Sequence, residues 1–231
     1  MAGSQVANLL RTAYRRARAH FGHQRWWPGE TPFEVIVGAI LTQNTNWGNV
    51  AKAIANLKHV KVLAPRKLYA LSPRRLAQLI RPAGYFNVKT KRLRSFLGYF
   101  LDRYGGDTTR MARQQLAQLR EELLSVKGIG PETADSILLY ALEKPIFVVD
   151  AYTHRILQRH FLATEEADYD TVQSTFMDRV APDVTLYNDF HAQLVAVGKH
   201  YCRPKNPRCS ACPLNGWNWE QSVAGGITPA R

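Results

Sequence analysis

Residues 123–135 read LLSVKGIGPETAD, and this stretch decides the fold. Gly128 and Gly130 enclose the single residue Ile129, so the backbone there can take positive φ angles and carries little side-chain cover. Pro131 suits the first position of a helix, because that position needs no N–H donor. The stretch therefore predicts a helix, a tight Gly-Ile-Gly turn and a second helix.

The turn also has a chemical use. Backbone N–H groups at the start of the second helix point outward, and the helix dipole favours an anion at that end. Lys127, Gly128, Ile129 and Gly130 are therefore candidates to hold a DNA phosphate without reading the base sequence. The alternative is that the same turn only connects two helices.

The charge of the chain favours a nucleic-acid partner. Among 231 residues there are 31 Lys and Arg against 18 Asp and Glu, which gives a formal net charge of +13. Phosphates provide most non-specific nucleic-acid affinity, so such a surplus suits DNA. A basic enzyme without such a partner is the alternative.

No apolar run approaches the roughly 20 residues of a membrane span, and no apolar segment precedes the first arginines, so we expect neither a span nor a secretory signal.

Helical periodicity dominates the rest of the sequence, and no segment alternates strictly between apolar and polar residues. We therefore predict an all-α fold of ten or eleven helices. Thr31 with Pro32, and Ser72 with Pro73, have the residue types of helix starts. The expected helices span residues 7–21, 33–41, 50–57, 73–80, 89–104, 113–124, 131–142, 151–160, 169–180 and 187–200.

Several separated segments resemble the endonuclease III superfamily of helix-hairpin-helix DNA glycosylases. The hairpin is followed by VVD at 148–150, and LTQNT at 41–45 and GYFNVK at 84–89 lie upstream in the family order. The resemblance covers roughly Trp26 to Cys212. Within the superfamily, three segments resemble the 3-methyladenine DNA glycosylase III branch: WWP at 26–28, RPAGYFN at 81–87 and KGIGPETAD at 127–135.

The resemblance implies two helical domains with a cleft between them. One would be a helical barrel of residues 32–145 that contains the hairpin. The other would combine residues 1–31 with residues 146–214, and residues 215–231 would form an irregular tail. Asp150 would then lie at the mouth of the interdomain cleft, where ligands commonly bind.

The hairpin lacks the lysine that bifunctional members of the superfamily use. Their Schiff-base lysine stands two residues after the second glycine, where this chain has Glu132. Without an amine there, no imine with the sugar forms by that route. The resemblance therefore implies a monofunctional glycosylase that excises alkylated purines and leaves the strand intact. Its lead substrate is 3-methyladenine, with N7-alkylated guanine as a further candidate.

Asp150 matches the catalytic aspartate of the superfamily. Cleavage of an N-glycosidic bond builds positive charge on the sugar, as in glycoside hydrolysis. A nearby carboxylate stabilises that charge and can orient or deprotonate the attacking water. The alternative is that Asp150 caps the helix starting at Ala151, and the two roles are compatible.

The resemblance assigns the base pocket to Trp26, Trp27, Pro28 and Trp47. A base alkylated at N3 carries a positive charge on a flat ring, and aromatic faces attract it by about 0.5–2 kcal/mol per contact. The alternative is that these tryptophans belong to the core. Lys199 falls on a lysine that is carbamylated in the branch, and an ordinary surface lysine is the alternative there.

A glycosylase must also extrude its target nucleotide from the duplex. Gln43 matches the glutamine that the superfamily inserts into DNA, and Tyr85 lies in the loop expected to wedge between bases. Lys89 and the cations after it are placed to meet phosphates, unless they form a solvated face. The expected partner is double-stranded DNA with a damaged base, bound by a monomer, and the expected location is cytoplasmic and nucleoid-associated.

Cys202, Cys209 and Cys212 match the iron–sulfur loop of the superfamily as far as its third ligand. The fourth ligand position is occupied by Asn218. We expect a four-iron four-sulfur cluster held by three cysteines, with Asn218 or His200 as the fourth ligand. Loss of the cluster and a zinc site are the alternatives. An odd number of cysteines disfavours a disulfide framework.

Two other functions remain as alternatives on the sequence alone. An endonuclease III-like enzyme for oxidised pyrimidines is disfavoured by Glu132 and by the double tryptophan. A non-catalytic helix-hairpin-helix DNA-binding protein is disfavoured by Asp150 together with the pocket aromatics.

Overall fold

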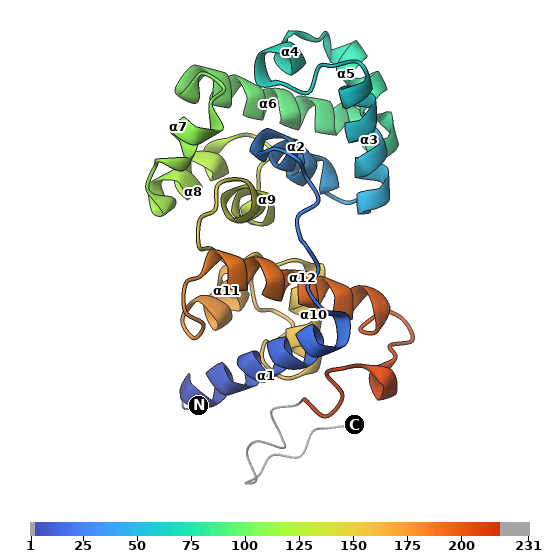
Figure 1. Cartoon of the computed structure of the whole chain (residues 1–231), viewed down its shortest axis with the longest axis vertical. Coiled ribbons are helices and arrows are strands. Elements are labelled where there is room, and N and C mark those ends of the chain that lie inside the picture. Colours follow the sequence, from blue (N-terminus) through green and yellow to red (C-terminus); the bar gives the residue numbers. More distant parts are fainter. Residues whose placement is uncertain (1–2, 218–231) are drawn as a thin grey trace. The chain divides into compact units, whose positions relative to one another are not determined.

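The computed structural model describes residues 3–217, and all regular elements in this range are helical. The chain divides into two compact units. The first holds the residues up to Trp26 together with those from Pro145, and the second is Trp27–Lys144. The prediction of an all-α fold is confirmed (Figure 1). None of the described helices is long and apolar enough to cross a membrane.

The second unit is built around α2 (Pro32–Thr42), which is buried from Phe33 to Leu41. This helix packs against α3, α6, α9 and the π-helix that follows α9. A helix that is apolar on almost every side needs such cover. The elements around α2 are α3 (Trp47–His59), α4 (Pro65–Ala70), α5 (Pro73–Leu79), the 3-10 turn Arg81–Ala83, α6 (Phe86–Tyr104), α7 (Thr108–Ala112), α8 (Leu116–Ser125), α9 (Pro131–Ser136) and the π-helix Ile137–Ala141.

The first unit is organised by α12 (Val184–His200), which packs against α10 (Ala151–Arg159) and against α1 (Gly3–Phe21). Its remaining elements are α11 (Tyr169–Met177) and the 3-10 turn Cys209–Ala211. The stacked rings of Phe147 and Phe176, with centroids 3.8 Å apart, form the centre of its core.

Most helix starts follow from local capping chemistry. The Thr31 hydroxyl accepts from Glu34 N at 3.2 Å and the Ser72 hydroxyl from Arg75 N at 3.2 Å, which confirms both predicted starts. The prediction of one helix over 113–124 is wrong at its start. There Asp107 caps the separate short helix α7, and α8 begins only at Leu116.

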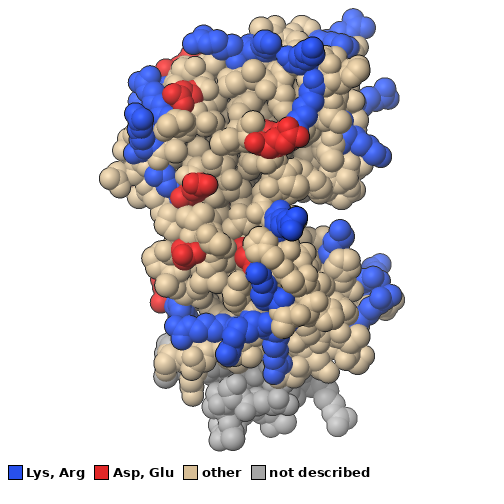
Figure 2. Space-filling view, in the orientation of Figure 1, with Lys and Arg blue, Asp and Glu red and all other residues tan. Residues whose placement is uncertain are grey.

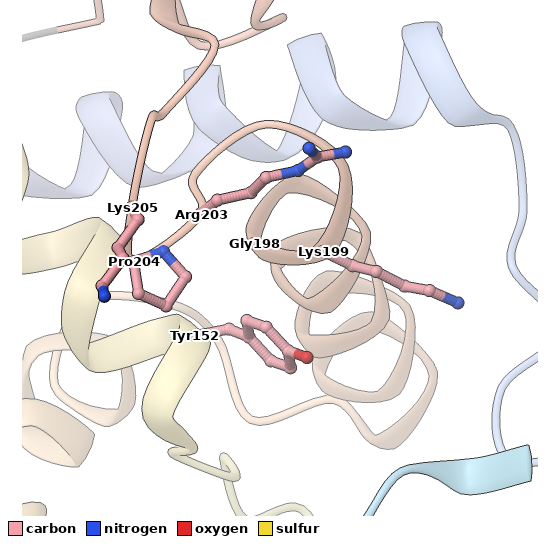
Figure 3. Close-up of a pocket in the computed structure, with 6 residues that line it drawn as sticks. All are labelled: Tyr152, Gly198, Lys199, Arg203, Pro204 and Lys205. Carbon is pink, nitrogen blue, oxygen red and sulfur yellow. The ribbon is translucent and has the colours of Figure 1, made fainter.

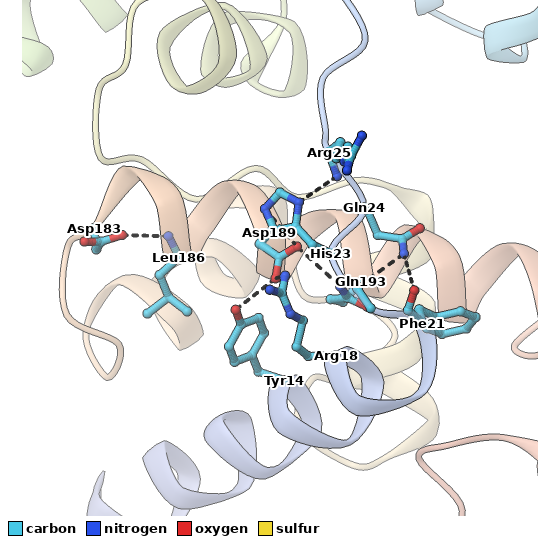
Figure 4. A network of polar contacts seen from close by, with 11 residues as sticks. Tyr14, Arg18, Phe21, His23, Gln24, Arg25, Asp183, Leu186, Asp189 and Gln193 are labelled. Carbon is cyan, nitrogen blue, oxygen red and sulfur yellow. Dashed lines mark hydrogen bonds and ion pairs between the residues drawn. The ribbon is translucent and has the colours of Figure 1, made fainter.

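A buried carboxylate ties the N-terminal helix to α12 (Figure 4). Asp189 accepts from the Tyr14 hydroxyl at 2.9 Å and from the Arg18 guanidinium at 2.7 Å. Burial, and then the bond to Asp189, raises the pKa of Tyr14 to about 12. One turn further on, the Gln193 amide donates to Gly22 O at 2.7 Å. These bonds anchor the segment that leads to Trp26.

Candidate active site

The hairpin turn exposes backbone rather than side chains. Gly128 has φ +93°, and a Cβ there would overlap the side chain of Arg92, so the position requires glycine. Gly130 has φ −100°, so of the two glycines of the turn Gly128 alone uses a positive angle. Ile129 is buried while Lys127, Gly128 and Gly130 are exposed, so any anion would meet the backbone and Lys127.

Gln43 is already engaged by the hairpin. Its amide nitrogen donates to Gly128 O at 3.2 Å and to Thr133 Oγ1 at 2.9 Å, and Arg92 donates to its amide oxygen. Insertion into DNA would have to exchange these bonds for bonds to bases. The insertion role of Gln43 therefore stays a prediction.

The expectation that Lys89 meets phosphates is corrected, because Lys89 is 1% exposed. Its ammonium donates to Leu41 O at 2.9 Å and to Ala83 O at 2.7 Å. Burial lowers the pKa of Lys89 to about 8, with help from the neighbouring Arg92 charge. The Lys89 ammonium therefore links the C-terminal end of α2 to the 3-10 turn that precedes the Tyr85 loop.

Lys89→Met should lower the free energy of unfolding by about 2–4 kcal/mol, because two buried carbonyl groups lose their donor while the aliphatic stem is kept. Lys91→Met, on the exposed side of the same helix, should change it by no more than about 0.5 kcal/mol. Urea unfolding measures both. Equal stabilities of the two variants would show that the Lys89 bonds contribute nothing.

Tyr85 stands out on the surface of the second unit. It is 70% exposed and has φ +43°, an unusual combination for a large aromatic residue. The loop before α6 thus exposes the Tyr85 ring to solvent. This geometry suits the predicted wedge between bases.

The two adjacent tryptophans fall in different units. Trp27 packs edge-on to Trp47 at 5.1 Å between ring centroids and lies 5.0 Å from Tyr140, at 33° between the planes. A Cβ on Gly38 would lie 3.3–3.4 Å from both tryptophans, so this glycine lets the rings approach α2 closely. We call Trp27, Trp47 and Tyr140 the aromatic cluster. Pro28 beside it is exposed.

Trp26 belongs to the first unit, where its ring centroid lies 6.5 Å from that of His191. His191 Nε2 lies 3.6 Å from Asp150 Oδ2, an ion-pair distance when the imidazole is protonated. The structure thus brings Trp26 and Asp150 to the same histidine of α12.

Asp150 has its other oxygen in the cap of α10. Oδ1 accepts from Thr153 N at 2.7 Å, which confirms the capping role. Burial by itself raises the pKa of Asp150, but His191 and the Thr153 N–H outweigh it and hold the pKa below its ordinary value. The group is therefore a carboxylate at neutral pH, with a fixed orientation.

Lys199 lies at the exposed end of α12, on the wall of a cavity of about 570 Å³ (Figure 3). Arg203 and Lys205 line the same cavity, and Tyr152 packs against Gly198 so closely that a Cβ there would overlap its ring. The surroundings are cationic, as an anionic carbamate would need. The modification of Lys199 stays a prediction.

The three cysteines are free thiols at the end of the first unit. Burial raises the pKa of Cys212, and the Cys202 and Cys209 thiols add to that rise. Three thiolates suit three irons of a four-iron cluster. Within residues 3–217, no three His, Cys, Asp or Glu side chains are gathered as a ready-made metal site. His200 is exposed, and Asn218 lies outside the described residues.

Helix α10 connects the cysteine loop to the aspartate. From its C-terminal end, Arg159 donates to Cys202 Sγ at 3.4 Å and to Arg203 O at 2.7 Å. Arg155 donates to Cys202 O at 2.8 Å. A bound iron–sulfur cluster would therefore stabilise the position of α10, the helix that Asp150 caps.

Comparison with known proteins identifies the family. The model of the HhH-GPD superfamily base excision DNA repair proteins matches residues 37–182. The chain belongs to this superfamily. The model for the iron–sulfur binding domain of endonuclease III matches residues 202–217, which confirms the cysteine motif of a four-iron four-sulfur site.

Similar proteins cover 79–89% of this HhH-GPD chain. A candidate DNA repair glycosylase of Methanocaldococcus jannaschii is 45% identical, over 89% of this chain and 94% of its own length. Endonuclease III of Thermotoga maritima is 28% identical, over 79% and 80%. Among solved structures, the Helicobacter pylori 3-methyladenine DNA glycosylase bound to 1,N6-ethenoadenine is 31% identical, covers 84% of this chain and 97% of its own, and has a TM-score of 0.73.

Sequence reasoning missed three residues of the candidate site. His191 lies on a buried face of α12 and has no motif around it. Tyr140 is in the apolar π-helix segment, where a ring predicts only core. Arg92 is one of the cations that follow Lys89 in the sequence, whereas in the structure its guanidinium donates to the Gln43 amide oxygen.

Proposed function

We propose that this protein is a monofunctional DNA glycosylase that excises alkylated purines, with 3-methyladenine as its lead substrate. The observation that carries the proposal is Glu132 at the hairpin position of the catalytic lysine, while Asp150 is retained. The 31% identity to the Helicobacter pylori 3-methyladenine DNA glycosylase supports the substrate class.

Asp150 would act on the sugar. As the bond from C1′ to the base breaks, positive charge develops on the sugar, and the ionised carboxylate stabilises it. The same carboxylate can take a proton from the water that attacks C1′. His191 would serve as a positioning residue, because it lies against the oxygen that does not cap α10.

The leaving base needs no protein acid. A purine alkylated at N3 or N7 already carries a positive charge, so it departs as a neutral base. The aromatic cluster would attract that charge before cleavage, and Trp26 would do so from beside His191. Gly38 would determine how closely the rings of the aromatic cluster pack on α2, because it has no side chain to keep them away.

DNA binding would combine the hairpin with the wedge loop. The exposed backbone at Gly128 and Gly130, with Lys127 beside it, offers donors for a phosphate. Tyr85 offers a ring for insertion. Figure 2 shows many more Lys and Arg than Asp and Glu side chains on the visible face of each unit, a surplus that favours binding to the DNA phosphates.

Borohydride should trap no covalent protein–DNA adduct during turnover, because no amine stands at position 132. Abasic strands should also stay unbroken until alkali is added. Denaturing gels of labelled duplex measure both outcomes, with an authentic endonuclease III as the positive control. A trapped adduct would show that another lysine is the nucleophile, and Lys127 and Lys199 would be the first to replace.

An endonuclease III-like activity on oxidised pyrimidines is the second candidate. It is favoured by the 28% identity to endonuclease III of Thermotoga maritima and by the matching iron–sulfur domain. Release of free base from defined duplexes distinguishes the two. A non-catalytic DNA-binding module would release no base at all.

A further inference from the structure

A groove of about 640 Å³ lies between α5 and α6, next to the exposed Tyr85. Three cations line it, Arg74, Arg81 and Lys91, and none of its lining residues is acidic. Within the described part of the chain, none of the three makes an ion pair. The groove therefore has an uncompensated positive charge.

The floor of the groove contains an unsatisfied polar group. Thr90 is 3% exposed, and its hydroxyl has no hydrogen-bond partner. A buried hydroxyl without a partner is costly, so a ligand that supplies one gains stability there. Asn87 lines the groove one turn earlier and adds an amide.

The groove also has an aromatic wall. Phe86 is half-buried in it, with the Arg81 guanidinium carbon 6.0 Å from the ring centroid. Cations, a hydroxyl, an amide and a ring together match a nucleotide: phosphate oxygens suit the cations, and the base suits the ring. A free inorganic anion would leave the aromatic wall unused.

We propose that this groove binds one unstacked nucleotide of the DNA other than the target nucleotide, namely a neighbouring nucleotide that is displaced when Tyr85 enters the duplex. Phe86 directly follows Tyr85 in the chain, so a nucleotide pushed aside by the Tyr85 ring is within reach of the groove. Its base packs on Phe86 and its phosphate meets Arg81 and Lys91. The inference rests on the proposed function because it assumes that the protein binds DNA. It does not depend on which base the protein excises.

The test uses the whole protein and two undamaged duplexes, one fully paired and one with a single-nucleotide bulge. Fluorescence anisotropy gives the affinity for each. Wild type should bind the bulged duplex about tenfold more tightly, and Thr90→Val should reduce that preference to about twofold. Arg81→Gln with Lys91→Gln should also remove it. The control pair Arg110→Gln with Arg113→Gln, exposed cations of equal charge elsewhere in the same unit, should keep it.

Two outcomes would overturn the proposal. One is an unchanged preference for the bulged duplex in the groove variants. In that case the groove pair and the control pair of substitutions would lower the affinity for both duplexes equally, as expected of a solvated cationic face. The other is equal competition by inorganic phosphate and by a deoxynucleoside 5′-monophosphate, which would mark an anion site only. Undamaged DNA keeps this test separate from the proposed function, whose failure would appear only in base release.

Discussion

Asp150→Asn should lower the rate of base release by about 10²- to 10⁴-fold while leaving folding and DNA binding intact. Asparagine removes the negative charge but still caps a helix well, so the bond to Thr153 N persists. The substitution therefore separates the proposed catalytic role of Asp150 from its capping role. Single-turnover kinetics, duplex binding and thermal unfolding measure the three quantities.

Asp168→Asn is the matched control for that variant. Asp168 caps α11 through Thr171 N at 2.8 Å, but it lies in no candidate site. It should match wild type in base release and in thermal midpoint. If Asp150→Asn released base at the wild-type rate, the carboxylate charge would have no part in the chemistry.

Cys209→Ser should remove most of the iron-dependent visible absorbance and lower the thermal midpoint. Cys209 is exposed, so exchange of its sulfur for oxygen costs little by itself and the effect reports on ligation. The protein should be brown after anaerobic preparation and lose iron in air, because only three thiolates hold the cluster. Ser210→Ala is the control, since it changes an exposed neighbour in the same turn.

The rate of base release shows whether the cysteine loop acts by stabilising the structure or by taking part in the chemical step. Since the arginines of α10 hold the cysteine loop, Cys209→Ser should weaken DNA binding and stability more than the chemical step. An iron-free wild-type protein from anaerobic expression, equal to the variant in stability and binding, would show that the cysteines ligate nothing.

Local rules predicted much of this fold from sequence. Thr31, Ser72 and Asp150 cap helices through bonds to residues three positions away, so their roles are readable in a short window. The apolar residues of α2 predict burial in the same way. The π-helix after α9 was not predicted, because the spacing of its apolar residues also fits an ordinary helix.

Contacts between distant segments explain what the sequence could not show. Lys89 reads as one cation in a basic run, yet its ammonium is bonded to Leu41 O, 48 residues away. His191 and Asp150 meet only because α12 packs on α10. Such partners leave no local pattern, so the surface assignment of Lys89 failed and His191 was missed.

The base that leaves the DNA distinguishes the two candidate enzymatic functions. The most direct measurement is the identity of the free bases released from two duplexes, one methylated and one containing thymine glycol, incubated with equal amounts of the protein. Chromatography with mass detection identifies each base, and Asp150→Asn controls for spontaneous depurination. We predict release of 3-methyladenine with no thymine glycol. Release of thymine glycol without 3-methyladenine would contradict the proposed substrate class.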